Sequence, residues 1–73
     1  MNPDHVSFVE YREALEYKIA FYGFTSNPLT VREMFQVHKQ GITLEDAYGI
    51  ACDANALQDS FDVQESINLI KGI

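Results

Sequence analysis

The sequence predicts an all-α fold, a small bundle of three or four helices. Three observations support this prediction. The chain has 73 residues, of which 47% are hydrophobic and 22% charged, and this size and composition fit one folded domain. Four segments carry helix-capping residues followed by apolar residues at helical spacing. No segment alternates strongly between apolar and polar residues, as a half-buried strand would.

The first helix is expected from about Phe8 to Tyr22. Ser7 stands at the capping position with Glu10 three residues later, which is the pattern of a capping box. Gly23 follows the last apolar residue and accommodates the left-handed conformation that commonly ends a helix. The segment is therefore predicted to be helical from end to end.

The same kind of capping residue predicts the second and third helices. Thr30 begins another capping box, which predicts a helix from about Val31 that ends at Gly41. Thr43 is expected to cap a third helix over residues 44–54, with two acids in its first turn where the helix dipole favours them. The two helices are thus joined by a short turn.

The C-terminal segment is the least determined part of the chain. A fourth helix is expected from Val63 to Lys71, closed by Gly72. Isolated helices of this length are marginal in water. The expected organisation is therefore a helical core domain over residues 1–54, followed by a segment over residues 55–73 that is either a short helix or a flexible tail.

The first helix carries two apolar stripes. The stripe that we expect to face the core consists of Phe8, Tyr11, Leu15, Ile19 and Tyr22. A second stripe, well round the helix, consists of Ala14, Tyr17 and Phe21. Either other helices cover this second stripe, or it is left for a partner, since aromatic side chains are enriched at interfaces.

The next two helices carry one apolar face each. On the second helix the expected face consists of Val31, Met34, Phe35 and His38. On the third it consists of Leu44, Ala47, Ile50, Ala51 and Ala54, with Tyr48 at its edge.

The turn between the second and third helices resembles that of a helix-turn-helix motif. The shared features are a glycine, an apolar residue, a capping hydroxyl, and apolar residues six and nine positions after the glycine: Gly41, Ile42, Thr43, Ala47 and Ile50. The sequence departs from that pattern at Val37, where a small residue is expected, and at Gln40, where an apolar one is usual. An ordinary antiparallel helical corner explains the same residues.

The charge of the chain disfavours DNA as a ligand. The net charge is −6, divided into −1 over residues 1–42 and −5 over residues 43–73. If the resemblance held, the third helix would be the recognition helix, yet it presents Glu45, Asp46 and Asp53 and no lysine or arginine. DNA affinity depends strongly on neutralising phosphates, so we expect no direct DNA binding. These acids either serve the helix's own N-terminus or form an acidic face for a basic partner.

The sequence contains no pattern of catalytic or metal-binding residues. The candidates His5, His38 and Cys52 do not form any zinc or metalloprotease spacing. We therefore expect a protein that is not an enzyme, with no catalytic residues, no metal and no cofactor. A single cysteine, no apolar run long enough to cross a membrane and no signal-peptide pattern lead us to expect a cytoplasmic protein.

A small, acidic, helical chain with spare aromatic residues resembles the phage-encoded host-takeover proteins, and among them the regulators of host RNA polymerase. The resemblance implies binding to a polymerase subunit in the host cytoplasm and inhibition of transcription. The residues expected to contact a host protein partner are Val6, Phe8, Tyr17, Phe21, Glu45, Asp46 and Asp53. The alternatives are a helix-turn-helix regulator that binds DNA and a nucleic-acid mimic of the anti-CRISPR type.

Overall fold

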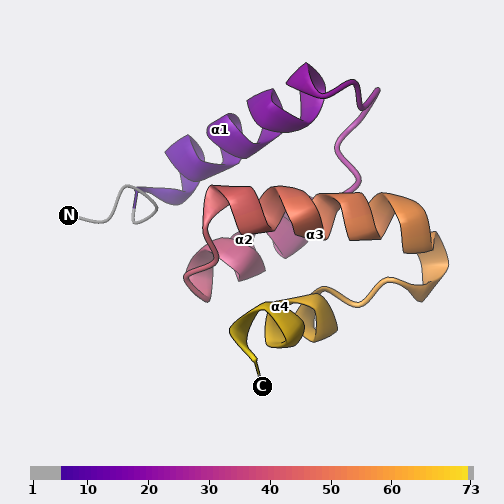
Figure 1. Ribbon diagram of the computed structural model, residues 1–73. Coiled ribbons are helices and arrows are strands. Elements are labelled where there is room, and N and C mark those ends of the chain that lie inside the picture. Colours follow the sequence, from indigo (N-terminus) through magenta and orange to yellow (C-terminus); the bar gives the residue numbers. More distant parts are fainter. Residues whose placement is uncertain (1–5, 73) are drawn as a thin grey trace.

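The computed structural model describes residues 6–72, and over this range the chain is helical with short connections (Figure 1). The elements are α1 (Phe8–Phe21), α2 (Val31–Lys39), α3 (Leu44–Leu57), the 3-10 helix η1 (Gln58–Ser60) and α4 (Val63–Lys71). No strand occurs among the described residues. The prediction of a small all-α bundle is confirmed.

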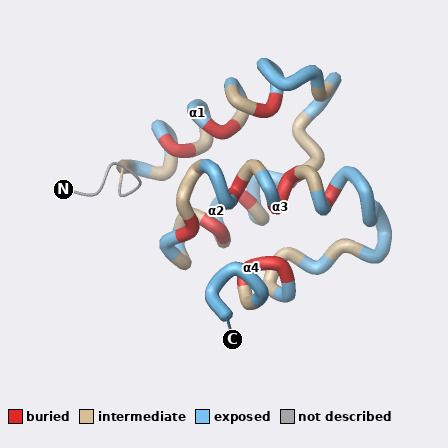
Figure 2. The backbone as a smooth tube through the Cα atoms, viewed as in Figure 1, coloured by how far each residue is buried: buried red, intermediate tan, exposed pale blue. Residues whose placement is uncertain are grey.

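Helix α3 lies at the centre of the arrangement. It packs against α1 on one side and against α4 on the other (Figure 1). Helix α2 also packs against both α1 and α4. The buried residues therefore lie on the inner faces of the helices, and most of the outer surface of α1 is uncovered (Figure 2).

Capping side chains mark the helix starts. Thr30 Oγ1 accepts a hydrogen bond from the Glu33 amide at 3.1 Å, and the Glu33 carboxylate accepts one from the Thr30 amide at 2.8 Å, so the predicted capping box is present. Thr43 caps α3 in the same position, as predicted, and Ser7 caps α1 through one bond from the Glu10 amide, without the reciprocal bond of the predicted capping box. Asp62 caps α4. These bonds satisfy amide groups that a helix leaves unpaired at its N-terminus.

A buried tyrosine ties α1 to the turn between α2 and α3. The Tyr11 hydroxyl donates a hydrogen bond to the Ile42 carbonyl at 2.6 Å, and the Tyr11 side chain is fully buried. The ring of His38 meets the Tyr11 ring edge-on at 4.9 Å, while His38 Nε2 donates to the Val6 carbonyl at 2.7 Å. These contacts fix both the position of α1 and its rotation about its own axis.

The turn itself has the predicted features. Gly41 adopts a φ of +77°, Ile42 is buried, and Thr43 caps the helix that follows. Ile42 therefore serves as the apolar plug of the corner and also presents its carbonyl to Tyr11.

The C-terminal segment is part of the same core. Ile67 on α4 is fully buried. A cluster of amide side chains also joins α4 to α2, because Gln64 Oε1 accepts from Gln36 Nε2 and Gln40 Nε2, each at 2.7 Å. Gln64 Nε2 donates in turn to Asn68 Oδ1 at 2.9 Å. Residues 63–71 thus form a helix that packs against α2 and α3.

The structure corrects the expected position of Tyr22 and the expected buried face of α2. Tyr22 was expected in the core but is 58% exposed, since α1 ends one residue earlier and the chain turns away at Gly23. On α2 the buried residues are Met34 and Val37, whereas Val31 and Phe35 are about half exposed. Val37 lies three residues after Met34, so the two share the buried side of the helix.

Helix α3 extends three residues beyond the expected end at Ala54. Residues 55–57 contain no glycine or proline to stop it. The helix ends instead at Gln58, whose φ of +50° is unusual for a residue with a side chain.

Alanine substitution at Gly49 and at Gly41 should have opposite effects on stability. Gly49 lies inside α3 with open space where a Cβ would be, so Gly49→Ala should raise the free energy of unfolding by ~0.5–1 kcal/mol. Gly41→Ala forces a side chain onto positive φ and should lower it by about 1 kcal/mol. Thermal denaturation followed by circular dichroism measures both. A stabilising Gly41→Ala would contradict the described turn.

The hydrogen bond between the Tyr11 hydroxyl and the Ile42 carbonyl can be tested by removing the hydroxyl oxygen. Tyr11→Phe leaves the Ile42 carbonyl buried without this donor and should lower the free energy of unfolding by ~1–2 kcal/mol in urea denaturation. Tyr17→Phe removes the same atom from an exposed ring and should change it by less than ~0.5 kcal/mol. Equal effects of the two variants would show that the hydroxyl of Tyr11 does not hold α1 in place.

Candidate functional site

Three large aromatic side chains are exposed on the C-terminal half of α1 and at its end. Tyr17 is 75% exposed, Phe21 71% and Tyr22 58%. The second apolar stripe of the first helix is therefore not covered by α2 or α4. Single exposed apolar residues are common on protein surfaces, but neighbouring exposed rings on one face mark binding sites more often.

The exposed rings continue across to α3. Phe21 and Tyr22 meet edge-on at 5.2 Å between ring centroids, and Tyr22 lies 5.1 Å from Tyr48. Lys18 Nζ lies 5.6 Å from the centroids of both the Tyr22 and the Tyr48 ring, within the range of cation–π attraction. We call Tyr17, Phe21, Tyr22 and Tyr48 the aromatic face. The ring contact and Lys18 hold Tyr22 and Tyr48 in place, whereas Tyr17 lies four residues before Phe21 on the outward stripe of α1.

Tyr48 anchors the aromatic face on α3. Partial burial raises the pKa of its phenol above the ordinary value, and its hydrogen-bonding contact with Cys52 adds to this. The phenol is therefore neutral at physiological pH and retains its proton as a hydrogen-bond donor. The Phe24 and Tyr48 rings also meet edge-on, with 6.2 Å between their centroids.

The N-terminal candidates lie elsewhere. Val6 and Phe8 are half-buried and pack against the core. The Phe8 ring meets Phe35 at 5.2 Å and His38 at 5.8 Å. Their apolar surface is largely used by the fold, and neither residue is part of the aromatic face.

The acidic candidates on α3 occupy two separate places. Glu45 and Asp46 are exposed in the first turn of the helix, where the Asp46 amide donates to the Thr43 cap at 3.1 Å. Asp53 lies eight residues after Glu45, about 12 Å along the helix axis. The structure therefore does not gather the three carboxylates into a single cluster.

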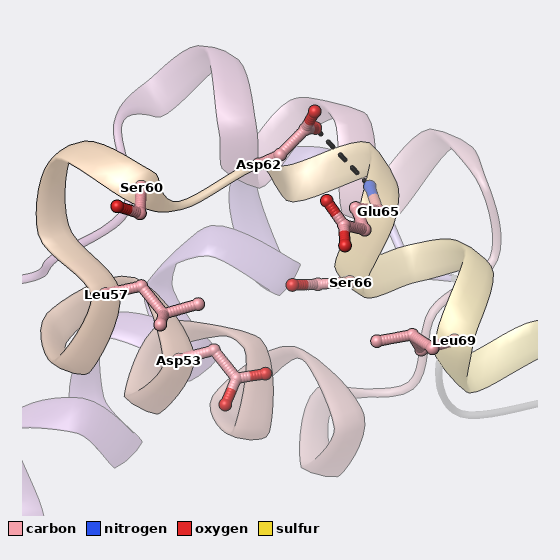
Figure 3. Close-up of a pocket in the computed structure, with 7 residues that line it drawn as sticks. All are labelled: Asp53, Leu57, Ser60, Asp62, Glu65, Ser66 and Leu69. Carbon is pink, nitrogen blue, oxygen red and sulfur yellow. Dashed lines mark hydrogen bonds between the residues drawn. The ribbon is translucent and has the colours of Figure 1, made fainter.

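Asp53 instead lines a pocket between α3 and α4 (Figure 3). The pocket has a volume of about 200 Å³ and is lined by Asp53, Leu57, Ser60, Asp62, Glu65, Ser66 and Leu69. The residues that accompany Asp53 could not be identified from the sequence. The only signal was the charge of −5 over residues 43–73, which does not show which acids meet.

The described residues offer no metal centre and no membrane-spanning helix. Among residues 6–72, no three histidine, cysteine or acidic side chains are placed to hold a metal ion. Within the same range, no helix is both long and apolar enough to cross a bilayer. Cys52 is half-buried beside Tyr48, and His38 is engaged with Val6; His5 lies outside the described residues.

Comparison with known proteins gives no relative: no family model, no curated protein and no solved structure matches the chain. The geometry described above is therefore the basis for any functional conclusion.

The charge of α3 leads to a prediction about DNA. At 50 mM salt and micromolar protein we expect no shift of duplex DNA in a gel-mobility assay, because α3 presents carboxylates and no cation to phosphates. Genomic fragments of mixed sequence serve as the probe. Micromolar binding that weakens steeply with added salt would contradict this prediction and favour the helix-turn-helix alternative.

Proposed function

We propose that this protein is a small regulator that acts by binding another protein through the aromatic face. The single observation that carries the proposal is the exposure of Tyr17 and Phe21, at 75% and 71%, on a helix whose opposite side is fully packed. Keeping such rings in water gains no folding energy, and burying them would stabilise a complex at roughly 25 cal/mol per Å² of apolar area removed from water.

The chemistry of the aromatic face supports a protein partner. Tyrosine and phenylalanine are enriched in the centres of protein interfaces, where rigid rings fill pockets of the partner at a low cost in side-chain entropy. Tyr17 and Tyr22 also carry hydroxyl groups that can hydrogen-bond with a partner. Lys18 is held between two rings of the face and offers a cation at its edge.

As the target we propose host RNA polymerase. The support is the resemblance in profile to small phage-encoded regulators: an acidic helical chain of 73 residues, with an exposed aromatic surface and no motif for catalysis. In this proposal the chain occupies a polymerase surface needed for σ factor or promoter engagement and thereby inhibits transcription. Its net charge of −6 would favour a basic surface on the polymerase, since charge steers association.

The test compares two sets of variants in binding to purified bacterial RNA polymerase, core and holoenzyme, by biolayer interferometry. Tyr17→Ala combined with Phe21→Ala should weaken binding by about 30-fold or more, because two interface aromatics are removed. Val9→Ala, at another exposed apolar residue of α1, should leave the affinity within about twofold. Transcription from a σ-dependent promoter in vitro should lose its inhibition in the same order.

The opposite pattern would identify a nucleic-acid mimic. In that case Glu45→Gln with Asp46→Asn would abolish binding, and the double aromatic variant would bind normally. Absence of binding to polymerase at about 10 μM would reject the proposed target. Equal affinity of the wild type and the double aromatic variant would reject the aromatic face.

A further inference from the structure

We infer that the segment bound by α1 is an amphipathic helix of the protein partner, with a lysine or arginine on the face that meets α1. The inference rests on the proposed function, because it takes the exposed rings of α1 as part of a protein-binding surface. It specifies the secondary structure and the charge of the segment that contacts Tyr17 and Phe21.

The outward side of α1 is a continuous helix face that the rest of the bundle leaves uncovered (Figure 2). Its residues recur at intervals of three and four, and all of them are exposed: Glu10, Glu13, Ala14, Tyr17, Ala20 and Phe21. We call these six residues the outward stripe. At the rise of an α-helix it is about 16 Å long, which is roughly three helical turns. A partner helix can therefore lie along it.

Small residues give the outward stripe a relief that matches a helix. Ala14 and Ala20 lie one turn before and one turn after Tyr17, so low positions flank this ring on both sides. When two helices pack, a side chain of one inserts into a hole formed by four residues of the other. A β-strand of the partner would find no edge to pair with, since the described residues include no strand.

The outward stripe contains two such holes in a row. The N-terminal hole is formed by Glu10, Glu13, Ala14 and Tyr17, and the C-terminal hole is bordered by Tyr17, Ala20 and Phe21. The two sets begin at Glu10 and Tyr17, seven positions apart. A partner helix that fills both is expected to do so with side chains about seven residues apart, because that spacing returns to the same face.

The N-terminal hole is rimmed by two carboxylates without a cation of their own. Glu10 and Glu13 are neighbours on one face of the helix, where like charges repel. Within residues 6–72 neither carboxylate is part of an ion pair. The other charges of α1 are engaged elsewhere, since Arg12 pairs with Glu16 at 3.3 Å and Lys18 lies over two rings of the aromatic face. The charge that complements this hole must therefore come from the partner.

The chemistry of each hole then selects a side chain. A lysine or arginine in the N-terminal hole can lay its methylene stem over Ala14 and bring its charge to both carboxylates, with the Tyr17 ring beside it. The C-terminal hole is bordered by rings and a methyl group and carries no charge, so it fits a leucine or isoleucine. The two holes together define a basic amphipathic helix.

The test is a selection of peptides on the immobilised full chain from a phage-displayed library. The random peptides are about 16 residues long, enough for roughly four helical turns. We expect the enriched sequences to place a lysine or arginine about seven residues from a leucine or isoleucine, within a helical apolar pattern. The synthesised peptide should gain helical circular dichroism on binding. Enriched peptides with central prolines or without a basic residue would overturn the inference, and so would the absence of any enriched peptide.

Variants of the chain locate the selected peptide and test its charge. Glu10→Gln combined with Glu13→Gln should weaken its binding about fivefold. Asp53→Asn combined with Asp59→Asn removes the same charge from α3 and η1 and should keep the affinity within about twofold. Equal weakening by both pairs would show general attraction to an acidic protein and overturn the assigned charge. Unchanged binding to Tyr17→Ala would place the peptide elsewhere and overturn the site.

These outcomes are separable from those of the polymerase experiment. A basic helix selected on the outward stripe, together with no binding to RNA polymerase, would reject the proposed target and support the inference. Extended peptides selected on the same stripe would reject the helix and leave the aromatic face as a protein-binding surface.

Discussion

The structure depends on one buried hydrogen bond, from the Tyr11 hydroxyl to the Ile42 carbonyl. A hydroxyl placed in the core must find an acceptor, because an unpaired buried polar group costs on the order of 1–3 kcal/mol. Only one rotation of α1 about its axis brings this hydroxyl to the turn between α2 and α3. The same rotation buries Leu15 and Ile19 and turns Tyr17 and Phe21 toward solvent. The binding surface that we propose is thus a consequence of the rotation of α1 that pairs the buried Tyr11 hydroxyl with the Ile42 carbonyl.

The arrangement of four short helices explains why surplus apolar surface remains. Helices α2 and α3 both pack against the same side of α1, and α4 packs against the other side of that pair. No element of the described chain is left to cover the outward stripe of α1 (Figure 2). The C-terminal helix is held by the buried Ile67 and by the amides around Gln64, and the pocket lined by Asp53 forms where it meets α3. The aromatic face and the acidic pocket therefore lie on different parts of the surface.

Local signals predicted the elements of the fold well. The caps at Ser7, Thr30 and Thr43 are local interactions, and their residues fixed the helix starts from sequence alone. The buried face of α2 was predicted only in part: Met34 is buried as expected, but Val31 and Phe35 are about half exposed. A helix of nine residues with apolar side chains on several sides does not reveal which neighbours it will meet. Val37 is fully buried on the same side of α2 as Met34, and the sequence alone does not distinguish this side from the one that carries Val31 and Phe35. The exposure of Tyr17 and Phe21 remained open for the same reason. The pocket was beyond prediction, since Asp53 and Glu65 come from different helices and meet only in the folded chain.

The most direct test of the account is the solvent exposure of individual aromatic rings in solution. A soluble paramagnetic gadolinium chelate broadens the proton signals of rings that water reaches. We expect strong broadening of the Tyr17 and Phe21 ring signals and almost none for Tyr11, which is fully buried. Protection of Tyr17 and Phe21 in the monomeric protein would contradict it, because α1 would then be rotated or covered differently and no aromatic surface would be left for a partner.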